Sequence, residues 1–220
     1  MFEMHPVLEV FPSEGFTLWP VAEFDDYGFL PLTGALVPAE VGAAVMRIAA
    51  CNDVDPEGDG RPPRPGDPVG AFLHGLFTMD VLFAAGGLRV TDTATGVTVL
   101  PGCCSGLEDW RDGFGFVDGS APFDLGHDPG PLVERCGDLI RLTADTEADD
   151  SPVIELPVAE WRRLLADVER DLADFLRLAA GWAGRHLPDH AAAVAAALAR
   201  ALSMPAPVVS SERPVVSPER

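Results

Sequence analysis

The sequence predicts an α+β fold in which antiparallel hairpins pack with helices, followed by a C-terminal helical hairpin and a disordered tail. Strand-like segments occur in pairs around turn signals, and they do not alternate with helices as they would in a parallel sheet. The 220-residue chain is 47% hydrophobic, which is enough for a sizeable core. We divide it into an acidic mixed domain (1–157), a helical pair packed on that domain (158–204) and a tail (205–220).

The N-terminal part is predicted to contain a hairpin and two helices. Residues 7–10 and 16–24 favour β-structure on either side of the turn signal PSEG, and DDYGFLPLTG is expected to be a loop or a further short strand. Pro38 is typical of a first helical turn, and apolar residues then share one face up to Cys51. An apolar helix is predicted over residues 69–85, where Gly86 and Gly87 would end it.

The C-terminal part is predicted to contain two hairpins and two helices. LRVTDTATGVTVLPG alternates around TATG, and LIRLTADTEADDSPVIELP predicts a second hairpin with a long acidic tip. An alanine-rich helix is expected from Asp189 to Leu202, and Pro205 would end it. The longer helix before it, Val158 to Trp182, has a single apolar stripe: Trp161, Leu164, Val168, Leu172, Phe175, Ala179 and Trp182. Its outer face should carry the pairs Arg163–Asp167 and Arg170–Asp174.

The net charge of −20 is concentrated in the first part of the chain. Residues 1–157 hold 27 carboxylates and seven arginines, whereas residues 158–204 hold six of each. Such a surface repels nucleic acid and anionic lipid and attracts basic proteins. We therefore expect a basic protein partner, bound by exposed acids such as Asp25, Asp26, Asp149 and Asp150. The alternative is that the acidity only keeps the protein in solution.

Several features predict a cytoplasmic protein that neither spans a membrane nor binds nucleic acid. The N-terminal residues MFEMHPVLEVFP lack the basic region of a secretory signal. The longest apolar stretch contains His74 and Asp80, and one central Asp costs about 2.5–3.5 kcal/mol of insertion energy. We expect both residues at core positions, on different sides of the helix. The four cysteines fit free thiols in a reducing compartment: Cys51, Cys103, Cys104 and Cys136.

The segment PGCCSGLEDWRD, residues 101–112, carries most of the candidate chemistry. Ser105 and Glu108 have the spacing of a capping box, so a helix should begin there, with Asp109 in its first turn. The two cysteines precede this cap. Because nearby carboxylates disfavour a thiolate, we expect both to be small buried turn residues rather than reactive groups.

Two reactive arrangements of these cysteines stay open as alternatives. Cys104, His127 and Asp109 are the residue types of a nucleophilic trio, which need be adjacent only in space. A zinc site would combine Cys103 or Cys104 with His127 and Cys136, although these spacings match no known zinc ribbon. The sequence predicts no cofactor.

The loop DVDPEGDG resembles the opening of a calcium-binding loop. Its acids are weak candidates for a divalent cation: Asp53, Asp55, Glu57 and Asp59. The twelfth position of such a loop needs a bidentate glutamate, and Arg64 stands there. The sequence therefore predicts no high-affinity EF-hand and leaves weak divalent binding open.

The sequence contains no phosphate loop, dinucleotide fingerprint, nucleophile elbow or metalloprotease motif. We therefore favour a non-enzymatic protein-binding module, in its most concrete form an acidic immunity or inhibitor protein against a basic partner such as a toxin. One alternative is a cysteine- or metal-dependent hydrolase centred on Cys103, Cys104 and His127. The other is a scaffold or accessory subunit that assembles through its C-terminal helices, which would also allow a homodimer.

Overall fold

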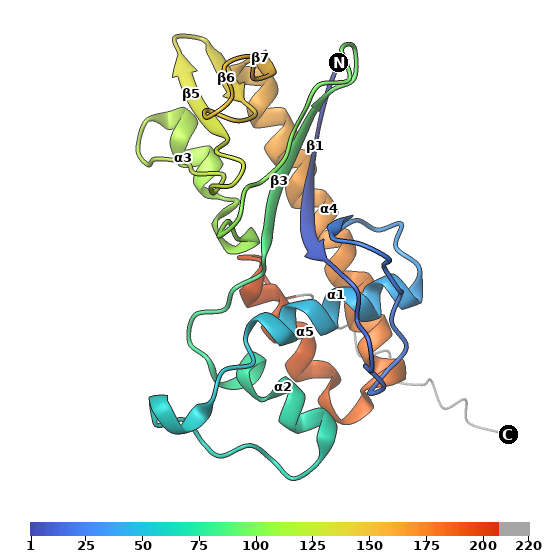
Figure 1. Ribbon diagram of the computed structural model, residues 1–220. Helices are drawn as coiled ribbons and strands as arrows, with labels where there is room; N and C mark the ends of the chain where they lie inside the picture. The colour runs from blue at the N-terminus through green and yellow to red at the C-terminus, as the bar shows by residue number, and fades with distance from the viewer. Residues whose placement is uncertain (207–220) are drawn as a thin grey trace, which may run out of the picture.

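The computed structural model describes residues 1–206 and confirms the α+β class. Within those residues there are five α-helices, a four-stranded antiparallel sheet in the order β2-β1-β3-β4 and a three-stranded antiparallel sheet in the order β5-β6-β7. The molecule is elongated, with the three-stranded sheet at one end and helices α2 and α5 at the other (Figure 1). Apart from its first two residues, the predicted tail lies outside the described residues.

The four-stranded sheet is built around one long N-terminal strand. Strand β1 pairs with β3 from Phe2 to Leu8, but with β2 only from Val7 to Val10. The predicted hairpin with residues 16–24 is wrong, because those residues form no strand. Their aromatic side chains pack on the helices instead, and the Nε1–H of the buried Trp19 donates to the carbonyl of Gly42. The four strands are β1 (Phe2–Val10), β2 (Gly28–Pro31), β3 (Gly86–Asp92) and β4 (Thr98–Val99).

Helix α1 (Pro38–Cys51) has the predicted bounds, whereas α2 (Pro68–Thr78) is shorter than predicted. The chain leaves α2 at Thr78, and Gly86 and Gly87 begin β3 rather than end a helix. At Gly86, which has a φ of 148°, an added Cβ would lie 2.0 Å from the carbonyl oxygen of Val7. This glycine therefore serves the close approach of β3 to β1.

The hairpin β3–β4 and the hairpin β6–β7 are both confirmed. The three-stranded sheet also contains a strand that was not predicted, β5, which pairs with β6. The elements of this region are η2 (Leu107–Asp109), α3 (Asp112–Asp118), β5 (Leu132–Cys136), β6 (Leu139–Thr143) and β7 (Val153–Pro157). A further short 3₁₀ turn, η1 (Pro56–Asp59), lies in the loop before α2.

Helix α4 (Val158–His186) runs along the molecule and joins its two ends (Figure 1). All seven residues of its predicted apolar stripe are buried. It packs against β1, α1, α3, β7 and α5 (Ala191–Ala201), and α5 follows the turn η3 (Pro188–His190). Helix α5 is thus shorter than predicted and ends before Pro205. Buried side chains from both sheets and these helices form one continuous cluster, and the division at residue 157 stays a prediction.

The outer face of α4 carries one of its two predicted ion pairs. Arg163 pairs with Asp167 at 2.6 Å as expected. The predicted Arg170–Asp174 pair is wrong, because Arg170 forms an ion pair with Asp167 and Asp174 forms one with Arg177. None of the helices within residues 1–206 is both long and apolar enough to cross a membrane.

Candidate functional site

The predicted capping box in residues 101–112 does not form. The element that follows is a 3₁₀ turn of three residues, with Gly106 at its N-cap position and no side chain capping it. Glu108 instead reaches back along the chain, and its Oε2 accepts a hydrogen bond from the Ala84 N–H at 3.1 Å. Burial raises the pKa of the Glu108 carboxyl above its ordinary value of 4.5. Its role is to hold the segment that leads into β3.

The structure brings Cys103, Cys104 and His127 together. The two sulfur atoms lie 3.4 Å apart, and the Cys103 Sγ lies 3.4 Å from the His127 Nδ1. All three ligand atoms lie within 4.8 Å of one another, and neither Asp109 nor Cys136 belongs to this group. The expectation that the cysteines are buried is wrong, because both are exposed at the surface. We call Cys103, Cys104 and His127 the thiol–imidazole cluster.

Two backbone features hold this cluster in place. Cys103 and His127 form an antiparallel bridge, in which the His127 N–H donates to the Cys103 carbonyl at 3.1 Å and the Cys103 N–H donates to the His127 carbonyl. Gly102 allows the close contact, because an added Cβ would lie 2.7 Å from the His127 amide nitrogen. Cys104 has a φ of 63°, a left-handed conformation that non-glycine residues seldom adopt. The arrangement is thus fixed by the backbone.

The electrostatic surroundings disfavour a free thiolate at Cys103. The hydrogen bond with Cys104, desolvation, and the negative charges of Asp128 and Glu9 raise the pKa of Cys103. Desolvation, together with the same Glu9 charge that acts on Cys103, raises the pKa of the Tyr27 hydroxyl to about 12. A cysteine nucleophile needs the opposite field, one that lowers its pKa.

Two of the four acids of the predicted cation loop have their carboxylates bound within the loop itself. Asp53 forms an ion pair with Arg64, and the Oδ1 of Asp55 accepts a hydrogen bond from the Glu57 N–H at 3.0 Å. Asp59 lies in the turn η1, and its side chain is outside the described part of the structure. These contacts help to hold the loop in its conformation.

The two polar residues of the predicted apolar helix differ in burial. His74 is buried in α2, and neither of its ring nitrogens has a hydrogen-bond partner among the described residues. Asp80 is exposed, so its predicted core position is wrong. The reason is that α2 ends at Thr78 and the chain turns toward solvent there.

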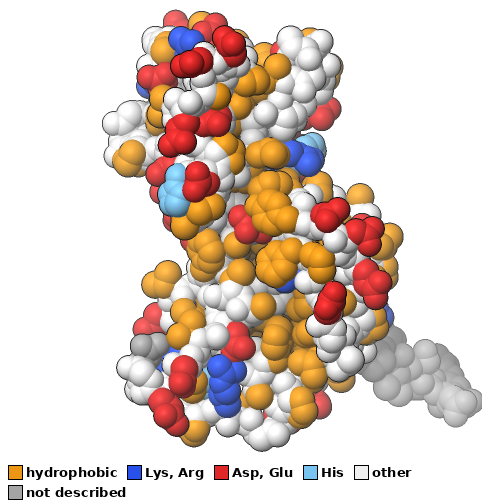
Figure 2. Space-filling model, in the orientation of Figure 1, with side chains coloured by type: hydrophobic (Ala, Val, Ile, Leu, Met, Phe, Trp, Pro, Cys, Tyr) orange, Lys and Arg blue, Asp and Glu red, His pale blue; other side chains and the backbone are white. Residues whose placement is uncertain are grey.

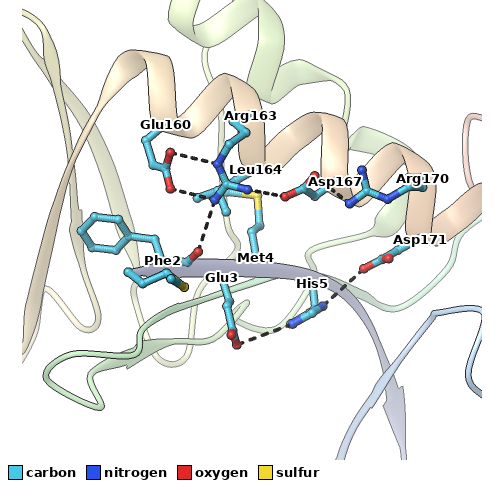
Figure 3. Close-up of a pocket in the computed structure, with 11 residues that line it drawn as sticks. Phe2, Glu3, Met4, His5, Glu160, Arg163, Leu164, Asp167, Arg170 and Asp171 are labelled. Carbon is cyan, nitrogen blue, oxygen red and sulfur yellow. Dashed lines mark hydrogen bonds and ion pairs between the residues drawn. The ribbon is translucent and has the colours of Figure 1, made fainter.

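A groove of about 470 Å³ lies between the start of β1 and helix α4 (Figure 3). Its floor contains Met1 to His5, and its wall contains α4 residues from Glu160 to Asp171. The guanidinium of Arg163 lies between Glu160 and Asp167, and it also donates to the Phe2 carbonyl at 3.5 Å. His5 lies between Glu3 and Asp171. We call this hollow the β1–α4 groove, and its carboxylates lie beside its own cationic or imidazole side chains.

A second hollow of about 340 Å³ is formed by the loop that links β1 to β2. Three carboxylates line it, those of Glu14, Glu23 and Asp25, together with the apolar side chains of Phe16, Val21 and Phe24. No arginine or histidine is among its lining residues, and its three carboxylates form no ion pair with the residues that the structure describes. We call this hollow the acidic pocket.

The acids predicted to bind a partner lie in two separate places. Asp25 and Asp26 are exposed in the β1–β2 loop, Asp25 in the wall of the acidic pocket. Asp149 and Asp150 are exposed in the β6–β7 loop, at the other end of the molecule (Figure 1). Figure 2 shows acidic side chains at both ends of one face and along one edge at mid-height, with hydrophobic side chains over much of the centre. Glu14 and Glu23 were not predicted, although residues 12–26 contain acids and no basic residue.

Comparison of the chain with protein-family models, with curated proteins and with solved structures found no match.

Proposed function

We propose that this protein is a non-enzymatic binding module for a basic protein, and that the acidic pocket receives an arginine or lysine side chain of that partner. The observation that supports this proposal is the set of three pocket carboxylates, Glu14, Glu23 and Asp25, which form no ion pair with residues 1–206. An immunity or inhibitor protein against a basic toxin is the most concrete form of the proposal.

The composition of the pocket suits a basic side chain in two ways. Carboxylates that lack an internal counter-ion gain a charge-assisted contact when a guanidinium or ammonium group arrives. The side chains of Phe16 and Phe24, which line the pocket, offer apolar surface to the methylene stem of a basic residue. The excess negative charge of residues 1–157 would also raise the rate of encounter with a basic partner.

Neither a cysteine nucleophile nor a scaffold that assembles through the C-terminal helices has an observation of equal weight. The raised pKa of Cys103 is the reverse of what a cysteine hydrolase requires. The apolar stripe of α4, which suggested assembly through the C-terminal helices, is already buried against β1, α1 and α5. A scaffold would therefore need another surface.

The proposal is tested by affinity capture from the native host with three versions of the protein as bait. The first is the wild type, and the second is the pocket variant Glu14→Gln, Glu23→Gln, Asp25→Asn. The third carries the same loss of three negative charges in the β6–β7 loop, as Glu147→Gln, Asp149→Asn, Asp150→Asn. We expect a basic protein that the wild type and the loop variant retain and the pocket variant loses. Equal retention by all three baits would contradict the role of the pocket.

A further inference from the structure

We infer that the thiol–imidazole cluster is a zinc site, in which Cys103, Cys104 and His127 supply three ligands and water supplies the fourth. The inference is independent of the proposed partner binding. It rests on the convergence of two sulfur atoms and one imidazole nitrogen at the surface, from two loops that the backbone holds together.

The distances within the cluster are close to those of a tetrahedral zinc site. Zinc–sulfur bonds of about 2.3 Å and zinc–nitrogen bonds of about 2.0–2.1 Å place two sulfurs about 3.8 Å apart and sulfur and nitrogen about 3.5 Å apart. The corresponding separations are 3.4 Å for the two sulfurs and 3.4 Å for Cys103 Sγ to His127 Nδ1. The third separation, from the Cys104 Sγ to the imidazole, is within 4.8 Å, so rotation of the Cys104 and His127 side chains would complete the geometry.

The backbone conformation brings the thiols of the two adjacent cysteines together. Neighbouring residues in an extended segment point in opposite directions, so two adjacent thiols do not ordinarily meet at one ion. The left-handed conformation of Cys104, with a φ of 63°, turns its side chain toward that of Cys103. A sparsely populated conformation at a non-glycine residue is typical of functional sites, where the surrounding structure maintains it.

The chemistry of the ligands selects the class of ion. Two thiolates and one imidazole favour zinc over magnesium or calcium, which prefer oxygen. The carboxylates of Asp128 and Glu9 act on Cys103 through their charge and would favour a bound cation. The exposure of the cysteines lets an ion reach the cluster from solvent.

A zinc ion at this position would join the two sheets. Cys103 and Cys104 follow β4 of the four-stranded sheet, and His127 precedes β5 of the three-stranded sheet. Three protein ligands leave one coordination position for water, as in zinc sites that are open to a ligand. The ion would therefore stabilise the connection between the two ends of the molecule.

The inference is tested on the full chain, reduced and freed of metal with a chelator. Co²⁺ serves as the spectroscopic probe, and Zn²⁺ then competes for the same site. We expect one Co²⁺ per chain with sulfur-to-metal absorption bands, displaced by one Zn²⁺, and a melting temperature that rises with zinc. Cys103→Ser, Cys104→Ser and His127→Gln should each lose at least tenfold in affinity, because each removes a ligand.

The matched controls are Cys136→Ser and Cys51→Ser, which remove cysteines outside the cluster. Both should bind cobalt and zinc as the wild type does. Circular dichroism of the metal-free variants checks that each is folded, and the backbone bridge of residues 103 and 127 does not depend on their side chains. Absence of stoichiometric binding by the folded wild type would overturn the inference, as would wild-type affinity in Cys104→Ser.

Discussion

The β1–α4 groove and the acidic pocket are both lined by carboxylates, but they differ in what balances that charge. In the groove, Arg163 lies between Glu160 and Asp167, and Arg170 pairs with the same Asp167. In the pocket, Glu14, Glu23 and Asp25 have no counter-ion among the lining residues. The number of acids is therefore a poor guide to binding, and the presence or absence of an internal cation is the better one.

This difference separates carboxylates that serve the fold from carboxylates that are free to meet a partner. A basic ligand in the groove would have to displace an arginine from its carboxylates, so breaking those ion pairs would offset the energy of the new ones. A basic ligand in the pocket has no ion pair of the described residues to break, so its contacts with the carboxylates are not offset in this way. Substitutions in the two hollows test this contrast, and the largest effect is expected where the groove meets the core.

The largest expected difference between the two hollows is in how much side-chain packing contributes to stability. Leu164 is buried where α4 faces the start of β1, with the side chain of Met4 pointing toward it (Figure 3). Leu164→Ala should lower the free energy of unfolding by about 2–5 kcal/mol, since it leaves a cavity in the core. Val21→Ala, in the partly exposed wall of the acidic pocket, should cost much less. Urea denaturation of both variants makes the comparison, and equal losses would mean that the pocket is as structural as the groove.

The next contrast concerns the charges themselves. Asp167→Asn removes the carboxylate that Arg163 and Arg170 share, so the melting temperature should fall by a small fraction of the Leu164→Ala effect. Glu23→Gln in the pocket should leave the melting temperature nearly unchanged, because Glu23 forms no ion pair with the described residues that the substitution could remove. Calorimetry at low salt gives both values, and a clear loss of stability in Glu23→Gln would mean that this acid serves the fold.

The sequence predicts the elements whose cause is local and misses those whose cause is distant. Pro38 and the helical spacing of the apolar residues after it predicted both ends of α1 correctly. The predicted apolar stripe of α4 is buried along its whole length. The end of α2 was missed, because Gly86 is required by the backbone of Val7, which lies far away in the chain. An apolar run alone does not show where a helix gives way to a strand.

The candidate sites follow the same rule. Cys103, Cys104 and His127 could be named from residue type, but their convergence depends on a backbone bridge between residues 24 positions apart. The spacing of Ser105 and Glu108 suggested a local helix cap. Glu108 instead accepts a hydrogen bond from the N–H of Ala84, which is also 24 positions away. A motif read from spacing assumes a local partner, and in both cases the tertiary partner decides the role of the side chain.

A smaller effect is expected in the pH dependence of stability. The hydrogen bonds and charge of Arg163 lower the pKa of Glu160 below its ordinary value of 4.5. A carboxyl whose pKa is lowered by folding stabilises the protein above its unfolded pKa and loses that contribution as the pH falls through its folded pKa. Glu160→Gln should therefore be slightly less stable than the wild type at pH 7, and the difference should shrink below about pH 4.5. Urea titrations at several pH values test this, and a constant difference would contradict it.

The smallest effect is expected from the acids of the β6–β7 loop on association with a basic partner. Asp149 and Asp150 lie far from the acidic pocket in the fold and would act only through the long-range field (Figure 1). Replacing them with asparagine should slow association slightly at low salt. The effect should vanish once the Debye length falls below roughly 10 Å, near 0.1 M salt.

Asp25→Asn together with Glu23→Gln removes the same charge from the pocket wall, where a bound cation would touch it. This pair should slow association at low salt and also speed dissociation, with an effect on dissociation that survives at higher salt, because a contact charge is screened less than a distant one. The measurement is the association and dissociation rate of each double variant against salt, with the partner captured by the wild type. If both variants change only the association rate, and by the same factor at every salt concentration, the acidity acts as a general field. The difference between pocket and groove would then concern stability alone.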